Sequence, residues 1–475
     1  MFNLAGLLCL QNFLKQQQLH CKSFILLTHL HLPFLFLKTI MSLDHKKTKS
    51  IHPTKTMKLP LSRYQKFVIA MLAVLQFFVV LDFMVISPLG VIIMPDLKIN
   101  SGAFGVIVSS YAFSAAAASI FAASFADRFD RKRLLLFFYT GFLIGTLFCG
   151  LAWNYPFLIF ARAFTGFFGG VIGSVVLSIV SDLFEYEKRG VAMGFVQSAF
   201  ASSQIFGIPI GIALAQIWGW RMAFILIAGL GTLIGIWILF FLKPVREHLA
   251  SKKTTHPFRN ILQILGNKDY LFSFLTIALL ITGGFMIMPF SSAFNVHNVG
   301  IPLENLGYVY LFSGLASLLA GPIIGRLSDT YGKFPLFLFG AILTILAVLI
   351  YTHLRQTSLV LLILITVVLF IGVTARMVTS QAITSGVPSP QNRGAFMSIN
   401  ASVQMLSGGL ASVLSGYLVT ISPTGSVENF PLVGYFVSAT ALITVYFMHK
   451  IQKQVNLRQA KSTKDVVKES VSISH

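Results

Sequence analysis

The stretch Ala126-Asp-Arg-Phe-Asp-Arg-Lys-Arg133 is a dense cluster of charge between two long apolar runs. A second stretch, Gly325-Arg-Leu-Ser-Asp-Thr-Tyr-Gly-Lys333, repeats its pattern of an acid followed by a base. Another pair, Arg189-Gly and Arg393-Gly, recurs at nearly the same offset. Because two independent matches share an offset of about 200 residues, the sequence predicts a duplicated unit of that length.

The composition places this chain in a lipid bilayer. It is 55% hydrophobic and only 11% charged, whereas soluble domains carry about 25% charged residues. The net charge of +21 comes from bases in loops and tails between apolar runs, so no nucleic-acid partner is expected. Cys9, Cys21 and Cys149 lack metal-ligand spacing, and neither a disulfide framework nor a metal site is expected. No other cofactor is expected.

The apolar runs predict an all-α integral membrane protein with twelve transmembrane helices in two six-helix halves. Each run is about 18 to 28 residues long, which suits a membrane-spanning helix. The predicted spans are 67–92, 103–125, 134–152, 156–180, 190–217, 221–242, 270–294, 304–326, 335–352, 358–384, 393–420 and 431–449.

The loops predict the division of the chain and its orientation. The halves are expected at 67–242 and 270–449, joined by a basic cytoplasmic linker at 243–269. Connections on the linker side hold most of the loop Lys and Arg, so the tails at 1–66 and 450–475 are both expected in the cytoplasm. Trp153, Trp218 and Trp220 fall at predicted outer boundaries, where indole rings anchor at the headgroups.

Residues 1–40 do not fit this pattern. Their apolar run is too short to span and carries His29, His31 and Pro33, with no clean signal-cleavage site after it. We interpret 1–40 either as a cleaved signal or as an over-extended start, with Met41 or Met57 as the initiator.

The charged loops give the chain a specific resemblance. A twelve-helix protein with two halves is typical of a duplicated secondary transporter. The sequence resembles the major facilitator superfamily, in its drug:proton antiporter or sugar-efflux branch, from about Lys66 to Lys450. The loop signature of that family, Gly-x-x-x-Asp-Arg-x-Gly-Arg-Arg, aligns on 123–132, with Ala123 and Asp130 in place of its two glycines. Because Asp tolerates a left-handed turn better than most residues, the same turn is expected at Asp130.

Two more segments carry the resemblance. The fourth-helix pattern Arg-x-x-x-Gly of the family matches Arg162 and Gly166. The fifth-helix run Gly207-Ile-Pro-Ile-Gly211 is a degenerate form of the antiporter motif, which expects Gly directly before Pro, where this chain has Ile208. That departure bears on antiport more than on the fold.

Asp82 and Arg162 are the candidate proton-coupling residues. Both lie well inside predicted spans, where a charge costs about 2.5–3.5 kcal/mol on insertion scales. Their predicted depths are compatible with a pair. An aspartate balanced between burial and a neighbouring arginine can bind and release a proton as water access alternates. The alternative is a static buried pair that fixes packing.

Five polar residues are candidates for a substrate cavity. Arg376 in segment ten could meet an anionic substrate group or a carbonyl, or it could act as a gate residue. Amides seven or four residues apart share a helix face, and they could bind substrate or bond across helices. The amides are Gln197, Gln204, Asn400 and Gln404.

The remaining candidates are conformational. Prolines interrupt the backbone hydrogen bonds of a helix and permit bending. Pro209 and Pro289, and the glycines Gly207 and Gly211 on either side of Pro209, are therefore hinge candidates. The family resemblance implies a cytoplasmic latch in which Asp127 lies near Arg393 and Asp329 near Arg189. The other residues of the two signatures assigned to this latch are Arg128, Arg131, Gly332 and Lys333. The alternative is that these charges only obey the positive-inside rule.

The sequence thus predicts a non-enzymatic exporter of small amphipathic molecules that works by alternating access in exchange for protons. The alternatives are a sugar or metabolite exporter, an uncoupled facilitator and, remotely, a receptor or membrane enzyme on the same scaffold. The expected partners are a small-molecule substrate, protons and the lipid bilayer, with the chain as a monomer. The resemblance to bacterial members implies an inner (plasma) membrane.

Overall fold

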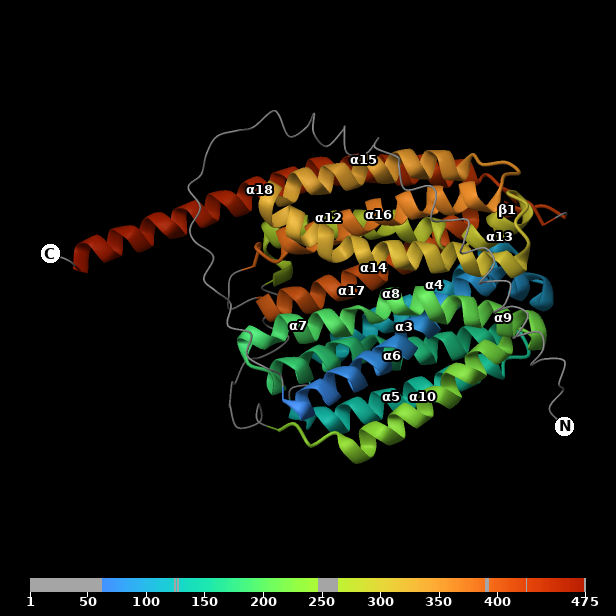
Figure 1. Ribbon diagram of the computed structural model, residues 1–475, viewed down its shortest axis with the longest axis horizontal. Coiled ribbons are helices and arrows are strands. Elements are labelled where there is room, and N and C mark those ends of the chain that lie inside the picture. Colours follow the sequence, from blue (N-terminus) through green and yellow to red (C-terminus); the bar gives the residue numbers. More distant parts are fainter. Residues whose placement is uncertain are drawn as a thin grey trace. The chain divides into compact units, whose positions relative to one another are not determined.

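The computed structural model describes residues 62–123, 125, 128–246, 264–388, 393–423 and 425–473. The expected N-terminal tail up to residue 61 and most of the expected linker, 247–263, lie outside these described residues. Within the described part, α-helices are almost the only regular structure, and they run alongside one another (Figure 1). A two-stranded antiparallel hairpin closes one end of the C-terminal half.

The N-terminal half contains six segments, of which the fifth is divided into four pieces. Its elements are α3 (Arg63–Leu97), α4 (Ser101–Ala123), α5 (Arg131–Gly150), α6 (Tyr155–Leu183), α7 (Tyr186–Gln197), α8 (Ala199–Ser202), the π-helix η3 (Ser203–Gly207), α9 (Ile208–Trp218) and α10 (Arg221–Phe241).

The C-terminal half also contains six segments, of which the first is divided into two. Its elements are α12 (Lys268–Ile287), α13 (Ser291–His297), the 3-10 turn η5 (Leu303–Asn305), α14 (Leu306–Tyr331), α15 (Lys333–Thr352), α16 (Leu359–Thr384), α17 (Arg393–Leu418), β1 (Thr420–Ile421), β2 (Val427–Glu428) and α18 (Phe430–Ile473).

The predicted fold class is confirmed. Among the described residues, 11 helical stretches are long and apolar enough to cross a membrane. Helix α17, with 26 residues, accounts for the remaining predicted segment. Figure 1 shows the blue-to-green helices α3–α10 gathered beside the yellow-to-red helices α12–α18, with α17 packed against α4 where the two halves meet.

Local sequence signals explain several helix starts. Ser62 and Gln65 form a capping box at the start of α3, each side chain bonding the backbone of the other. Asn154 caps α6, whose first turn contains a proline, and Ser358 caps α16. These caps satisfy N–H groups that the first turn of a helix leaves unpaired.

Two predicted segments are divided where a single helix was expected. Segment five includes the π-turn η3, which holds one extra residue per turn and ends at Gly207. Segment seven breaks at 288–290, around Pro289, before α13 begins. Conversely, α3 runs through Pro88 and Pro95 without a break, and α18 continues to Ile473, far beyond the predicted end at residue 449.

The predicted interfacial position is wrong for one of the three tryptophans. Trp153 and Trp218 are exposed as expected. Trp220, however, is buried, and its indole N–H donates to Asp96 Oδ2 at 2.9 Å. Arg221 Nη1 donates to the same carboxylate at 3.0 Å, so Trp220 joins α10 to the end of α3 instead of facing headgroups.

The hydrophobic cores show how the halves meet. We call the end of the bundle that carries β1 and β2 the hairpin end, and the end that carries Asp130 and Arg246 the linker end. Towards the hairpin end, one buried cluster draws on both halves, from Leu89 and Phe104 to Phe290 and Val433. Towards the linker end, the described core separates into clusters that each lie within a single half, one in the N-terminal half and two in the C-terminal half.

Candidate functional site

Asp82 of α3 and Arg162 of α6 form an ion pair inside the N-terminal half. Arg162 Nη1 lies 2.9 Å from Asp82 Oδ2, and both side chains are 0% exposed. The same nitrogen lies 3.4 Å from the Asp82 carbonyl oxygen. The structure therefore brings together the two residues that the sequence singled out for proton coupling, although it does not test that role.

A third residue, Tyr111 of α4, lies against the arginine of the pair. The Arg162 Cζ atom lies 4.6 Å from the centre of the Tyr111 ring, a separation at which a ring face attracts a cation. This approach depends on small residues in α6. A Cβ atom at Gly170 would lie 2.6 Å from the Ala115 backbone of α4, so glycine lets α4 and α6 pack closely.

Part of the hydrogen-bonding capacity of the pair is unused. Within the described residues, Asp82 Oδ1 and both Arg162 Nε and Nη2 have no hydrogen-bond partner. The carboxylate oxygen can accept a proton or a hydrogen bond, and the two guanidinium nitrogens can donate hydrogen bonds to a water molecule or a polar ligand. The pair also lies where two hydrophobic cores adjoin. Leu81, next to Asp82, belongs to the core that both halves share, and Val79 belongs to the core of the N-terminal half.

Arg376 of α16 has a different setting. It is 4% exposed, and its Nη2 donates to the Thr444 hydroxyl of α18 at 3.3 Å. Its Nε has no partner, and no ion pair to a described carboxylate is present. It is thus a buried cation without a nearby counter-charge in the described chain.

The four predicted amides divide by burial. Gln204 lies in η3 and Asn400 in α17; both are buried, and the side-chain carbonyl oxygen of each has no hydrogen-bond partner within the described residues. Gln197 is exposed and Gln404 is half-buried. The expected common face of Gln197 and Gln204 is interrupted, because α7 ends at Gln197, Ser198 is a turn, and Gln204 lies in the separate π-turn η3.

The hinge candidates occupy the two interrupted segments. Gly207 ends η3, Pro209 lies in the first turn of α9 and Gly211 follows within α9. Pro289 lies in the break between α12 and α13. Their positions match the expected irregularity of the backbone, while movement at these points stays a prediction.

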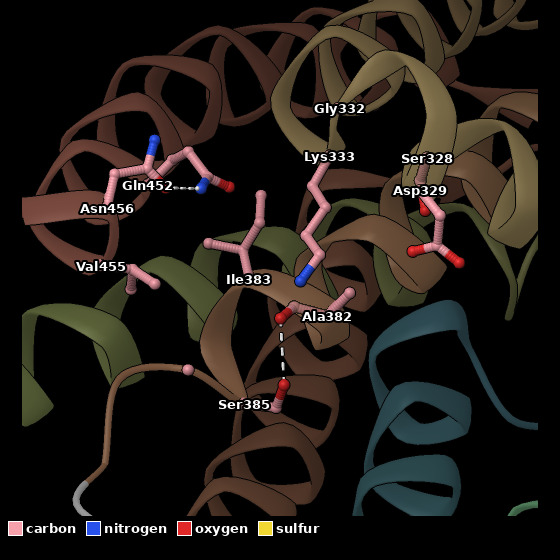
Figure 2. A pocket seen from close by; sticks show the side chains of 11 residues that line it. Ser328, Asp329, Gly332, Lys333, Ala382, Ile383, Ser385, Gln452, Val455 and Asn456 are labelled. Atoms are coloured by element: carbon pink, nitrogen blue, oxygen red, sulfur yellow. Dashed lines mark hydrogen bonds between the residues drawn. The ribbon is translucent and has the colours of Figure 1, made fainter. Parts of the chain in front are cut away.

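The latch candidates are not brought together in the described part of the chain. Asp127 and the side chain of Arg393 lie outside the described residues. Arg189 Nε donates to the Phe184 carbonyl at 2.9 Å. Asp329 is exposed and lines a hollow of about 560 Å³ with Lys333 and residues of α16 and α18, including Ile383 (Figure 2).

The first charged loop has partners that the sequence did not predict. Asp130 caps α5, accepting from the Lys132 N–H at 2.9 Å, and it accepts from Arg246 Nε at 2.7 Å. Arg131 Nε pairs with Asp182 at 3.2 Å, whereas Arg128 is exposed. The backbone of Asp130 has φ −56°, so the expected left-handed turn is absent: a capping residue takes extended backbone instead.

Gly332 keeps the left-handed turn in the second copy. Its φ is 96°, and it precedes α15 without a side-chain cap. The two signatures therefore align in sequence but differ in backbone conformation at the position where Asp130 replaces Gly.

Sequence reasoning missed three aromatic residues beside the pair. Tyr111, Phe83 and Phe285 form successive ring contacts from Arg162 towards the C-terminal half. No signal in the sequence distinguishes them, because the chain has 45 Phe and 13 Tyr, and many of these residues lie in its apolar spans.

Comparison with known proteins identifies related sequences. The family model described as Major Facilitator Superfamily matches residues 72–412 and, again, 273–473. YceJ of Bacillus subtilis, an uncharacterised transporter of that type, is 23% identical over 264 residues, which are 55% of this chain and 67% of YceJ. A probable sugar efflux transporter of Helicobacter pylori strain G27 is 25% identical over 236 residues, 50% of this chain and 59% of the relative.

A eukaryotic relative has a different name. Multidrug resistance protein fnx1 of Schizosaccharomyces pombe is 30% identical over 200 residues, which are 42% of this chain and 35% of fnx1. The chain thus aligns with about two thirds or less of the length of these three relatives.

Solved structures share the fold. A bacterial homologue of the human lysosomal transporter Spinster, in an inward-facing and unoccupied conformation, matches with a TM-score of 0.62 at 17% identity, covering 86% of this chain and 99% of that one. The nucleoside transporter NupG matches with a TM-score of 0.64 at 15% identity, covering 81% and 99%. Since the family model spans most of the twelve segments, the chain belongs to the Major Facilitator Superfamily, as the charged loops and the twelve spans led us to expect.

Proposed function

We propose that this protein exports small amphipathic molecules by alternating access, in exchange for protons that bind at Asp82. The observation that carries the proposal is the fully buried Asp82–Arg162 pair, with a carboxylate oxygen and two guanidinium nitrogens unpartnered in the described chain. A membrane protein seldom keeps charges at this depth without a functional reason.

The distribution of the core supports alternating access. The halves share one apolar core towards the hairpin end and have separate cores towards the linker end. Ser101 Oγ of α4 also donates to the Val419 carbonyl across the hairpin end at 2.6 Å. A cavity opening at the linker end, which we place in the cytoplasm, would give a substrate access between the halves.

The charge pair supplies a reason for coupling. A proton on Asp82 neutralises the carboxylate and leaves Arg162 as a buried, uncompensated cation, so the two protonation states favour different arrangements around the pair. One proton moving inward across 100 mV releases about 2.3 kcal/mol, roughly a 50-fold substrate gradient per charge.

Residues of both halves are proposed to line the substrate cavity. Arg376 would contact an anionic or carbonyl group, and the unpartnered amides of Gln204 and Asn400 would contact polar groups. Gln197 and Gln404 complete the proposed set. The latch of Asp127 with Arg393 and of Asp329 with Arg189 is proposed for the state closed at the linker end.

A sugar or metabolite exporter without proton coupling is the second candidate. The relatives named probable sugar efflux transporters favour this candidate, as does Ile208 in place of the glycine of the antiporter motif.

Transport in proteoliposomes distinguishes the two candidates. We expect fluorescent amphipathic dyes to be transported faster with an imposed pH gradient, and Asp82→Asn to abolish that dependence while Asp82→Glu retains part of it. Radiolabelled sugars serve as the second substrate class. Transport that does not depend on the pH gradient and is unaffected by Asp82→Asn would exclude proton exchange. The protein would then be the uncoupled transporter of the second candidate.

A further inference from the structure

A continuous chain of aromatic contacts leads from the charge pair to the other half of the protein. The Tyr111 ring, which lies against the Arg162 guanidinium, has its centre 5.1 Å from that of Phe83. The Phe83 ring in turn lies 5.8 Å from Phe285. We call Tyr111, Phe83 and Phe285 the aromatic chain.

The aromatic chain crosses the boundary between the halves. Tyr111 belongs to α4 and Phe83 to α3, whereas Phe285 belongs to α12. Phe285 is held in place by α17, because a Cβ atom on Gly408 would lie 2.9 Å from its ring. Phe83 and Phe285 are both half-buried, so their contact can open without disrupting the fully buried core of either half.

The geometry ties this chain to the charge state of the pair. Phe83 is the next residue after Asp82 in α3, so a shift of the α3 backbone at Asp82 moves the ring as well. When Asp82 is charged, its carboxylate holds Arg162; when Asp82 is neutral, that attraction between opposite charges is lost, and the contact of Arg162 with the Tyr111 ring face gains weight. A shift of Arg162 would press directly on Tyr111 and through it on Phe83.

The other titratable groups described around Asp82 offer no second connection from the pair to the C-terminal half. The charged or titratable side chains near it are Arg162 of α6, Tyr111 of α4 and Cys149 of α5. Arg221 of α10, which also packs on α3, is paired with Asp96 at the hairpin end. On α7, Arg189 bonds the Phe184 carbonyl.

We infer that the aromatic chain transmits the protonation of the Asp82–Arg162 pair to the contact between the halves, with Tyr111 and Phe83 as positioning residues. This inference rests on the proposed proton coupling. It assigns these residues a role that Asp82 and Arg162 alone cannot fill, because both members of the pair belong to the N-terminal half.

The test measures opening at the linker end without any substrate. Spin labels are placed on cysteines introduced at Phe195 of α7 and Tyr331 of α14, both exposed, in the full-length chain with Cys9→Ser and Cys21→Ser. Cys149 is buried and is retained. Pulsed-EPR distance distributions in lipid nanodiscs are recorded between about pH 8 and pH 5, across which a perturbed buried carboxylate can titrate.

The variants separate coupling from packing. In the otherwise unchanged labelled protein we expect acidification to change the ratio of open to closed populations about tenfold or more. Phe83→Leu, Phe285→Leu and Tyr111→Leu should reduce this response to about twofold or less, whereas Tyr111→Phe, which keeps the ring face, should preserve it. Phe113→Leu is the matched control, because Phe113 of α4 packs on Gly409 of α17, also where the halves meet, without joining the aromatic chain.

A double-mutant cycle completes the test. If the contact between Phe83 and Phe285 transmits the signal, losing both rings has the same effect as losing one. The pH response of Phe83→Leu/Phe285→Leu should then be no weaker than that of either single variant. The inference is overturned if the aromatic variants keep the full response, or if Phe113→Leu loses it equally. Absence of any response in the labelled parent protein would instead overturn the proton coupling of Asp82, and the inference with it.

Discussion

The two halves of the molecule treat buried charge in opposite ways. In the N-terminal half, Asp82 and Arg162 neutralise each other at 2.9 Å. In the C-terminal half, Arg376 is also buried but bonds only the hydroxyl of Thr444 in the described chain. The two halves therefore share their six-helix arrangement but differ in their buried charges: one half holds an ion pair, and the other a cation without a counter-charge in the described chain.

The interruptions of the helices diverge as well. The fifth segment of the N-terminal half contains a π-turn, whereas its counterpart α17 is continuous. The first segment of the C-terminal half breaks at Pro289, whereas its counterpart α3 runs through Pro88 and Pro95. Each half has one irregular segment, at a different place in the repeat, so the halves need not move as mirror copies of each other.

The largest expected effect comes from breaking the pair. Arg162→Met leaves Asp82 buried and unpaired and should lower the free energy of unfolding by about 3–5 kcal/mol. Arg376→Met removes a cation that has no counter-charge, and its stability should stay within about 1 kcal/mol of the natural protein or rise. Denaturant titration in detergent micelles measures both.

The control for this comparison restores neutrality. Asp82→Asn/Arg162→Met removes both charges and should recover at least half of the loss, because no uncompensated charge remains. Equal losses for Arg162→Met and Arg376→Met would show that the halves do not differ in how they hold charge.

A smaller effect is expected where the halves touch. Gly314 of α14 packs directly on η3, and a Cβ atom there would lie 2.8 Å from Gln204 Cβ and 3.0 Å from the Ile205 backbone nitrogen. Gly314→Ala should cost about 1–3 kcal/mol by overpacking and should loosen the contact between α14 and the π-turn. Thermal unfolding and the Phe195–Tyr331 spin-label distance report the two effects.

Gly321 provides the matched control on the same helix. A Cβ atom at this position meets no neighbour within 4 Å, so Gly321→Ala should be neutral or should gain about 0.5–1 kcal/mol from helix propensity. If the two alanine variants behave alike, close approach at Gly314 does not hold α14 against η3.

The sequence predicted the features of this structure that differ sharply from their surroundings in the chain, such as a charge within an apolar run. Twelve apolar runs and a repeated charged loop were enough for the fold, and Asp82 and Arg162 stood out because each is a rare charge in an apolar span. The aromatic chain could not be found this way, since Phe83 and Phe285 do not differ from the many lipid-facing phenylalanines. Only three-dimensional packing separates them.

Long-range contacts explain the other misses. The π-turn packs closely against Gly314 of the other half, a contact that no local sequence pattern encodes. Asp130 was expected to keep a left-handed turn, but it is instead drawn into contact with Arg246, 116 residues further on. Trp220 was expected at the headgroups, but Asp96 at the end of α3 holds its indole inside.

The smallest expected effect distinguishes the two charged loops. Asp130 is a capping acid, whereas the aligned Gly332 has left-handed backbone and no side-chain cap. Asp130→Ala should cost about 1 kcal/mol through loss of the cap. Asp130→Asn should cost less, because asparagine caps equally well and loses only the attraction to Arg246, which is 56% exposed and therefore contributes little.

The pH dependence of that difference follows from the charge on Asp130. Partial burial of its carboxyl opposes ionisation, but hydrogen bonds from Arg246 and from the Lys132 and Val245 backbone outweigh it, so the pKa is lowered from its ordinary value of 3.8. A lowered folded-state pKa means that the charged form stabilises the protein fully above the unfolded-state pKa, and that this contribution disappears as pH falls through the folded-state value. The stability gap between the natural protein and Asp130→Asn should therefore be constant between about pH 5 and 8 and should close below about pH 4. A gap that changed between pH 5 and 8 would mean that a different group responds to the substitution, and that Asp130 does not hold the start of the linker by its charge.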